Sequence, residues 1–354
     1  MVARISSPSL GAASYQEKGA WTAAVSHRWQ YSDKHFVGDV EQVYREKEGS
    51  QVINDMNVID LSVSYAVTKR INLTLAVPFQ FATRSQTIRD TRRVPGTGAS
   101  GPFLNPSPFP GPDGRVNGAV FDRFETSAGG LSDIKLLATS WLFDPETHKN
   151  QNISVGLGML FPTGEKDHKG VFEQFHTNSP GFIATTEQNV DNSIQPGSGA
   201  WGIIFDVSAF KEIFKNFNLF AAGTYVATPE RDAGVISGSL TAANPTIWSV
   251  NDSYLARAGF GYAFLPKYGL TFTLSGRLEG APVHDLIGSS EGRRRPGYAV
   301  SIEPGIVFTK NRWFASFSTP VALYRNRTQS AVETTGGDAA FADFMTLFSA
   351  GRSF

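Results

Sequence analysis

The feature that most constrains this chain is a strict alternation of apolar residues with small or polar ones. Between Ile59 and Val67, for example, every second residue is apolar and the residues between are small or polar. Successive side chains of a β-strand point to opposite faces, so a period of two predicts strands with one apolar face. The pattern predicts twelve strands, near residues 19–31, 53–67, 71–84, 131–143, 151–162, 201–210, 217–228, 253–264, 269–280, 297–309, 312–325 and 341–354.

The connections between these strands alternate in length. Every second connection is a short turn, such as residues 68–70 or 310–311. The others span about 15 to 45 residues, are rich in Gly, Pro, Asn and charge, and include the longest loop at 85–129. The sequence therefore predicts an all-β fold: a single antiparallel up-and-down transmembrane β-barrel of about 12 strands, with long extracellular loops and short periplasmic turns.

Composition excludes several other classes of protein. The chain has 354 residues, 32 basic and 32 acidic side chains, and no cysteine. A net charge of zero gives no footprint for nucleic acid, and the lack of cysteine excludes a disulfide scaffold and a thiol nucleophile. No apolar run approaches the roughly 18 residues of a membrane-spanning helix. Residues 1–18 lack the apolar stretch of a signal peptide, so we expect a periplasmic N-terminal segment there and the barrel over 19–354.

The polar faces of the predicted strands carry full charges. Unpaired charges are rarely tolerated in a dry core, whereas acids and bases can pair across a wet lumen. A membrane barrel is apolar outside and polar inside, so these charges indicate its interior. The residues expected to line the pore are Arg28, Asp60, Asp133, Lys135, Asp206, Arg257, Arg277, Glu279 and Glu303.

The apolar faces end in aromatic residues, such as Trp21 and Trp313 beside the short turns. Amphipathic rings favour the headgroup level and form the girdles of membrane barrels. The chain ends on Phe354, and a terminal aromatic residue on an amphipathic strand resembles the assembly signal of bacterial outer-membrane proteins, although Arg352 departs from that signal. We therefore expect a multi-pass β-barrel of the Gram-negative cell outer membrane, with Phe354 in its membrane assembly signal.

Short motifs are spread along most of the predicted barrel. They are Gly-Gly-Leu-Ser-Asp at 129–133, Phe-Pro-Thr-Gly at 161–164, Glu-Pro-Gly at 303–305, and Glu279 followed by Pro282 and Asp285. In these motifs the chain resembles a family of outer-membrane transporters named for the meta-pathway of phenol degradation. The resemblance implies a transport role and names no substrate.

Two places invite comparison with outer-membrane phospholipases and lipid A deacylases, which pair a His with a Ser on the outer barrel surface. They are Ser26-His27 and the stretch from His176 to Ser179. A serine nucleophile needs its base within reach and a third group that orients the base. Neither place shows the full spacing of the phospholipases, so we expect no enzyme activity.

Metal and cofactor sites are not indicated. The best metal candidates are His168 beside Asp167 and His284 beside Asp285. Adjacent residues of a strand point to opposite faces and make a poor chelate. The loop carboxylates show no EF-hand spacing for calcium. We therefore expect neither a metal site nor a cofactor.

Two loop segments are candidates for binding partners. Residues 293–295 are three arginines, and guanidinium groups match the phosphates of lipopolysaccharide; the alternative is a solvated loop tip. Residues 102–110 combine several prolines with three large apolar side chains that are expected to be shielded from water. Folding into the barrel mouth, which would constrict the lumen, and docking on a protein partner are the two interpretations.

Twelve strands fall between the eight that leave a filled interior and the sixteen of an aqueous porin. This intermediate size suits a narrow, porin-like channel. The sequence predicts passive, selective uptake of a small solute through the charged lumen, with hydrophobic or aromatic solutes among the candidates. The alternatives are a structural or anchoring barrel that binds a partner through its extracellular loops, and an outer-membrane lipid hydrolase.

Overall fold

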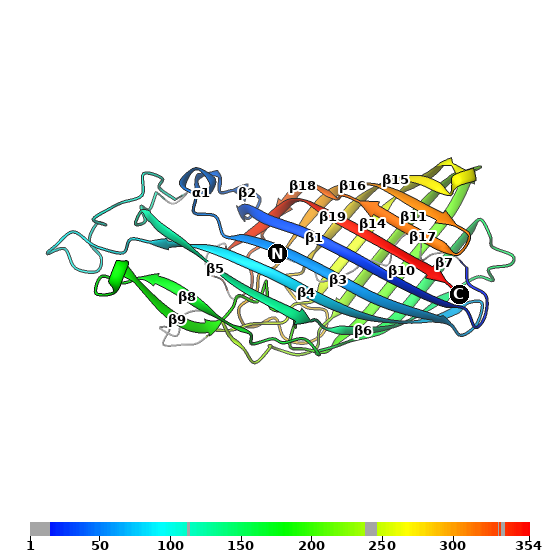
Figure 1. The fold of residues 1–354 in the computed structure, drawn as a ribbon, viewed down its shortest axis with the longest axis horizontal. Helices are drawn as coiled ribbons and strands as arrows, with labels where there is room; N and C mark the ends of the chain where they lie inside the picture. Colours follow the sequence, from blue (N-terminus) through cyan, green and yellow to red (C-terminus); the bar gives the residue numbers. More distant parts are fainter. Residues whose placement is uncertain (1–14, 112–113, 238–245, 332, 334–336) are drawn as a thin grey trace.

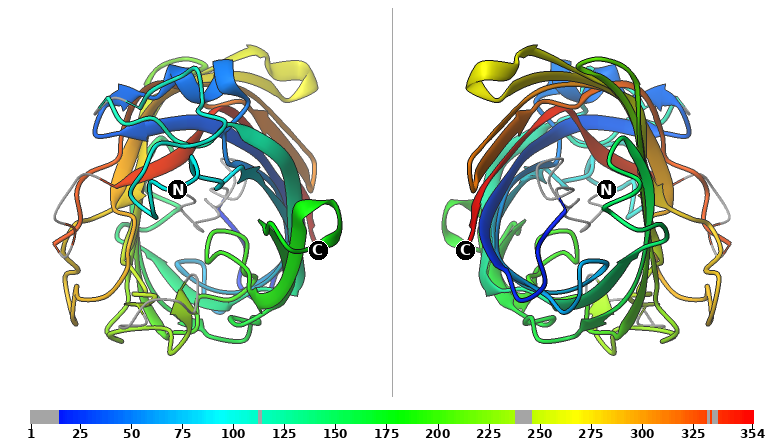
Figure 2. Two further views of the ribbon diagram at one scale, coloured as in Figure 1. Left: turned by 90° about the vertical axis from the view of Figure 1, so that its left-hand side faces the viewer. Right: turned by 90° about the vertical axis from the view of Figure 1, so that its right-hand side faces the viewer.

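The computed structural model describes residues 15–111, 114–237, 246–331, 333 and 337–354. In this part of the chain twelve antiparallel strands form a closed barrel (Figures 1 and 2), because β1 (Trp21–Val37) pairs with β19 (Asp338–Ser353). The wall between them runs, in order, through β3 (Ile53–Ala66), β4 (Ile71–Arg89), β6 (Ile134–Trp141), β7 (Gln151–Phe161), β10 (Gly202–Phe214), β11 (Phe217–Ala227), β14 (Ser253–Leu265), β15 (Leu270–Ala281), β16 (Gly297–Lys310), and one strand in two segments, β17 (Trp313–Ser318) and β18 (Val321–Asn326).

The twelve strands and the closed antiparallel barrel predicted from the sequence are confirmed. Several strands extend further toward the long loops than predicted: β1 reaches Val37 and β4 reaches Arg89. A further strand, β5 (Val120–Leu131), pairs with β4 in a stretch expected to be loop. These extensions project beyond the apolar belt of the barrel, where no apolar outward face is needed. The alternation therefore fades although the pairing continues.

Shorter elements lie among the long loops. They are β2 (Val40–Glu41), α1 (Val43–Glu48), the hairpin of β8 (Lys169–Phe175) and β9 (Ile183–Asn189) with a 3-10 turn at Pro180–Phe182, and the pair β12 (Ile236–Ser237) and β13 (Thr246–Ile247). At the short-turn end a 3-10 turn at Pro266–Tyr268 joins β14 to β15. It ends at Gly269, where φ is +77° and a Cβ would lie 2.1 Å from the Thr309 carbonyl oxygen, so glycine is required.

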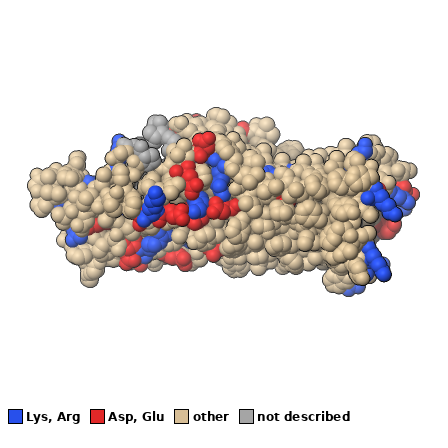
Figure 3. Space-filling model, turned by 90° about the horizontal axis from the view of Figure 1, so that it is seen from above, with Lys and Arg blue, Asp and Glu red and all other residues tan. Residues whose placement is uncertain are grey.

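The outward faces of the strands form an apolar belt. Leu157 is 59% exposed and Leu75 45% exposed on this surface. Figure 3 shows charges gathered in the left-hand half of the molecule and at its right-hand end, with few charges on the stretch between these two regions. Among the described residues no helix is long and apolar enough to cross a membrane. An apolar belt between two charged ends is the surface expected of a barrel that spans a bilayer with its strands.

The wall is interrupted between β18 and β19. In the described residues β18 pairs with β19 only at Val321 and Phe344, although it pairs with β16 along its length. Beyond that point the Arg325 side chain reaches across, donating to the Ala342 carbonyl oxygen at 3.0 Å and to the Asp343 carboxylate at 2.6 Å. The Arg325 guanidinium thus makes the contact between β18 and β19 where their backbone hydrogen bonds are missing.

Glu48, at the end of α1, anchors the loop segment 90–119. Its carboxylate accepts two hydrogen bonds from Arg89, at 2.6 and 2.9 Å, and one from the hydroxyl of Ser107. Burial opposes the ionisation of Glu48, but hydrogen bonds from Arg89, Ser107 and Ser50 outweigh burial and lower its pKa to about 2.

Acid is expected to release this segment. Because the pKa of Glu48 is lowered from 4.5, its stabilising effect is complete above about pH 4.5 and is lost as the pH falls toward 2. A spin label on Ala99→Cys, unique in a chain without cysteine, should become mobile over that interval. With Glu48→Gln the label should already be mobile at neutral pH, and a label on Asn311→Cys at the other end should not respond. An immobile label at Ala99→Cys through the whole interval would contradict this anchoring role.

Candidate functional site

The charged residues selected from the sequence lie on the inner face of the barrel. On β15, Arg277 is 2% exposed and Glu279 8% exposed, while Leu278 between them is 36% exposed on the outer face. Glu303 of the adjacent β16 is 2% exposed. The alternation that marks the strands therefore also sorts these charges to the inside.

Five of these residues form one ion-pair network. Arg277 contacts Glu279 at 2.6 Å and Glu303 at 3.4 Å. Arg257 of β14 lies 3.8 Å from Glu303. Arg28 of β1 lies 3.4 Å from Glu279. Since β16, the β17–β18 strand and β19 separate β15 from β1 in the wall, the last contact crosses the lumen.

The other four residues lie elsewhere on the inner wall. Asp206 accepts a hydrogen bond at 2.7 Å from Thr224 on the neighbouring strand. Asp133, just before β6, accepts hydrogen bonds from two backbone N–H groups of the long-loop segments. Lys135 and Asp60 line the cavity described below. The structure thus brings five of the nine predicted residues together and distributes the rest.

The segment 190–200, which follows β9, folds into the barrel. Gln80 of β4 donates from Nε2 to the carbonyl oxygens of Ile194 at 3.0 Å and Gln195 at 2.9 Å. Val190 and Ile194 are buried in an apolar cluster with residues of β3, β4 and β5. The segment therefore narrows the lumen toward the long-loop end.

Two of the sequence motifs meet on this segment. In the 129–133 motif, Asp133 binds the backbone N–H of Ser198 at 2.7 Å and that of Gly164 at 3.1 Å. Gly164 closes the 161–164 motif and lies so near Gly197 that a Cβ on Gly164 would be 2.6 Å from the Gly197 Cα. The motifs thus have a structural role, because they hold the inward-folded segment against the wall.

Ion pairs of Asp191 also hold the segment 190–200 in place. Its carboxylate accepts two hydrogen bonds from Arg295, at 2.7 and 2.8 Å, and lies 3.6 Å from Arg84. Burial opposes the ionisation of Asp191, but the two guanidinium groups outweigh it and hold its pKa well below the usual range. Gln80, Arg84 and Asp191 are not among the site residues predicted from the sequence. Gln80 and Arg84 lie at inward positions in the alternation of β4, and this pattern could have identified them. Asp191 lies in a loop, where no such pattern exists.

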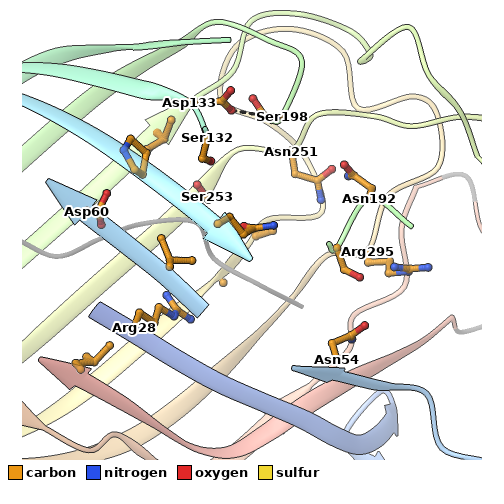
Figure 4. A pocket seen from close by; sticks show the side chains of 18 of the residues that line it. Arg28, Asn54, Asp60, Ser132, Asp133, Asn192, Ser198, Asn251, Ser253 and Arg295 are labelled. Carbon is orange, nitrogen blue, oxygen red and sulfur yellow. Dashed lines mark hydrogen bonds between the residues drawn. The ribbon is translucent and has the colours of Figure 1, made fainter. Parts of the chain in front are cut away.

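The barrel wall and the inward-folded segment enclose a cavity of about 270 Å³. Figure 4 shows Arg28 and Asp60 on one side of it and Asn192 and Arg295 on the other. Its lining also includes apolar side chains, among them Val58, Leu160, Val226, Trp248 and Val250. Apolar walls with a few placed polar groups are typical of sites for small molecules.

The arginines at 293–295 are not a solvated loop tip. Arg294 is 1% exposed and contacts Asp285 at 2.5 Å, and Arg295 binds Asp191. Arg293 is exposed and lies 5.1 Å from the ring centre of Trp248. Both interpretations, the solvated tip and the external site for lipopolysaccharide phosphates, are wrong for Arg294 and Arg295. Loop packing turns their guanidinium groups inward onto carboxylates.

Residues 102–110 do not constrict the lumen. Figure 1 shows the loop segment that contains them projecting away from the barrel at its long-loop end. Leu104 is 46% exposed, and the Phe103 ring is covered by the Arg93 guanidinium, 3.4 Å from the ring centre. The interpretation that this segment folds into the barrel mouth is therefore wrong. The segment that folds into the barrel is 190–200. Docking of 102–110 on a protein partner stays a prediction.

The Ser/His candidates show no catalytic arrangement in the described residues. Ser26 and His27 are neighbours on β1 and point to opposite faces, and His27 contacts the side chain of Asn57 at 3.0 Å. His176 and Ser179 lie 3.2 Å apart in the exposed turn between β8 and β9. No three His, Cys, Asp or Glu side chains are grouped as metal ligands in the parts of the chain described here.

At the short-turn end Tyr15 packs against inward-facing rings. Its ring centre lies 5.1 Å from that of Trp141 and 6.1 Å from that of Phe210. Asn152 donates a hydrogen bond to the Tyr15 hydroxyl at 3.1 Å. The chain thus reaches the inside of the barrel mouth before β1 begins. The expected division of the chain at residue 18 stays a prediction, and residues 1–14 lie outside the described residues.

The last residue completes the closure of the barrel. The backbone N–H of Phe354 donates to the Trp21 carbonyl oxygen at 2.7 Å, which extends the pairing of β19 with β1 to the end of the chain. The Phe354 side chain is 56% exposed, and the Arg352 guanidinium lies 5.0 Å from its ring centre. Its role in membrane assembly stays a prediction.

No protein-family model and no curated protein matches this chain. Among solved structures, the COG4313 outer membrane channel from Pseudomonas putida F1 is similar with a TM-score of 0.60 and 13% identity, over 98% of this chain and 100% of that one. This chain thus shares the β-barrel fold of that outer-membrane protein. The P. putida toluene transporter TodX has a TM-score of 0.46 and 10% identity, over 96% and 89% of the two chains. At these identities the likeness concerns the fold alone.

Proposed function

We propose that this chain is a channel of the outer membrane that admits a small solute passively through a narrow, charged lumen. The observation that carries the proposal is the cavity of about 270 Å³ inside a twelve-stranded barrel. The cavity lies between the inward-folded segment 190–200 and the ion-pair network. A solute that enters from the long-loop end would meet both before it reaches the short turns.

The chemistry of the lumen favours dipolar solutes with an apolar body. In this proposal the nine charged residues line the solute path, and their mixed signs create a field across it. Such a field attracts zwitterionic or dipolar molecules more than simple ions, as rings of charge do in other pores. Leu160, Val226 and Val250 offer an apolar wall to an aliphatic or aromatic body. The resemblance of the motifs to the phenol meta-pathway transporters supports a transport role.

Single-channel recording in a planar bilayer tests the proposal. The wild-type protein should show a small, weakly ion-selective conductance. Replacing residues 190–198 with a short Gly-Ser linker should enlarge it several-fold, because this segment occupies the lumen. Removing residues 101–110 is the control and should leave the conductance unchanged, because that segment projects away from the barrel. A barrel that conducts in none of these forms would contradict the channel function.

An anchoring barrel is the second candidate. The contact of Arg28 with Glu279 across the lumen, at 3.4 Å, favours it because ion pairs that cross the lumen obstruct it. The same recordings separate the two candidates. A protein that stays silent after the 190–198 replacement would be assigned as an anchor that uses its long loops.

A further inference from the structure

The short-turn end of the barrel carries an excess of positive charge that the proposed channel does not use. Ten exposed basic side chains lie at the turns and chain ends there: Lys18, Lys69, Arg70, Lys149, Lys211, Lys215, Lys267, Lys310, Arg312 and Arg352. The acidic side chains of the same region are Glu17, Asp144, Glu146 and Glu212. We call the ten cations the basic ring. Because the whole chain has no net charge, the remainder carries the opposite excess.

The basic ring surrounds the barrel. Each of the five short turns between barrel strands contributes at least one cation, directly or from the strand end beside it. Lys18 before β1 and Arg352 in β19 each add one more. Part of the ring is visible at the right-hand end of Figure 3. Lys69 pairs with Glu146, whereas no ion pair within the described residues involves Lys149, Lys211, Lys215, Lys267 or Arg312. At least half of the ring therefore has no ion-pair partner among the described residues.

Aromatic side chains indicate the depth of the basic ring in the membrane. The Lys310 ammonium lies 5.8 Å from the ring centre of Tyr268, and the Arg352 guanidinium lies 5.1 Å from that of Trp313. Both rings face outward and are more than half exposed, at 55% and 54%. Exposed Tyr and Trp at the edge of an apolar belt sit at the level of the lipid headgroups. The cations beside them are therefore at the level of the lipid phosphates.

We propose that the basic ring binds anionic phospholipid headgroups of the leaflet that surrounds the short turns. A leaflet meets the barrel on all sides, as the ring does, whereas a soluble acidic protein would meet a patch on one side. Clustered Lys and Arg beside a membrane attract anionic lipids, and this attraction adds to the hydrophobic anchoring of the belt. The proposal rests on the membrane location assumed in the proposed function but not on conductance.

Quenching of tryptophan fluorescence by brominated lipids tests the proposal, because Trp21 and Trp313 lie beside the ring. The protein is reconstituted in phosphatidylcholine vesicles that contain either brominated phosphatidylglycerol or brominated phosphatidylcholine. At low ionic strength we expect an about threefold preference for phosphatidylglycerol. The preference should approach unity in 1 M salt, where the Debye length is about 3 Å.

Matched variants locate the preference at the ring. The triple variant Lys211→Gln, Lys267→Gln, Arg312→Gln removes one cation from each of three turns and should lose most of the preference. The control variant Lys47→Gln, Lys169→Gln, Arg231→Gln removes three exposed cations from the long-loop end and should keep it.

Three outcomes would overturn the proposal. They are equal quenching of the wild type by both lipids, an unchanged preference in the first triple variant, and no quenching by either lipid. Only the last would also remove the membrane location on which the channel depends. A barrel that binds phosphatidylglycerol selectively but conducts nothing would fail as a channel and leave the lipid site standing.

Discussion

Glu303→Gln is expected to lower the free energy of unfolding by about 3–5 kcal/mol, the cost of removing one partner from a buried ion pair. Glu303 is 2% exposed and contacts Arg277 at 3.4 Å, Arg257 at 3.8 Å and the Ser318 hydroxyl at 2.8 Å. Without it, Arg277 keeps its contact with Glu279 at 2.6 Å but loses the second carboxylate that faces it. Urea unfolding of the reconstituted protein measures the loss. In a conducting channel the same variant should shift selectivity toward anions.

Two further variants separate this effect from general damage. Glu187→Gln removes an exposed carboxylate from β9 and should change the unfolding free energy by less than about 0.5 kcal/mol. Adding Arg257→Met to Glu303→Gln should recover part of the loss, because it removes a buried guanidinium whose ion pair with Glu303 is broken. Strict additivity of the two substitutions would mean that the ion pairs do not stabilise the barrel as a network.

Leu75→Arg is expected to destabilise the barrel by about 2–4 kcal/mol, the cost of placing an arginine on the lipid face of a membrane barrel. Leu75 points outward into the apolar belt and is 45% exposed. Leu157→Arg, at the more exposed Leu157, should have a comparable effect.

Thr74→Arg is the matched control, one residue away on the opposite face. Thr74 shares a hydrogen bond of 2.7 Å with Ser64 on the inside of the barrel. An arginine there can extend toward water at the short-turn mouth, so the change should be small. Urea titration in vesicles compares the pair. Equal losses at both positions would show that both faces of the strand are shielded from water, which a membrane barrel does not allow.

The barrel could be predicted from the sequence because a membrane imposes the alternation so strictly. Lipid excludes polar side chains from outward positions, so in strands such as β15 these positions hold apolar residues or glycine from end to end. Where β4 and β5 extend beyond the apolar belt, the requirement ends, and the residues from Arg84 to Arg89 no longer alternate between apolar and polar. Pairing continues there through backbone hydrogen bonds, which leave no signature in the side-chain pattern.

The inward position of these charged residues could also be predicted, whereas their contact partners could not. A full charge at an inward strand position has a low energy only in the lumen. The alternation of residues along the strand is therefore enough to predict that such a charge faces inward. Arg28 and Glu279 are 251 residues apart in sequence. Their contact depends on the closure and curvature of the whole barrel, which no local pattern encodes. The segment 190–200 escaped prediction for the same reason, because its anchors Gln80 and Asp133 act only after the barrel has closed.

The gap between β18 and β19 has a mechanical consequence. A closed barrel keeps its diameter because tension around its circumference is carried from strand to strand by backbone hydrogen bonds. Along β18 this load passes through the single register pair of Val321 with Phe344 and through the Arg325 side chain. A side chain with several rotatable bonds is far more compliant than a ladder. The circumference therefore has a soft sector along β18, bounded toward the long loops by the backbone bridge between Arg327 and Gly38.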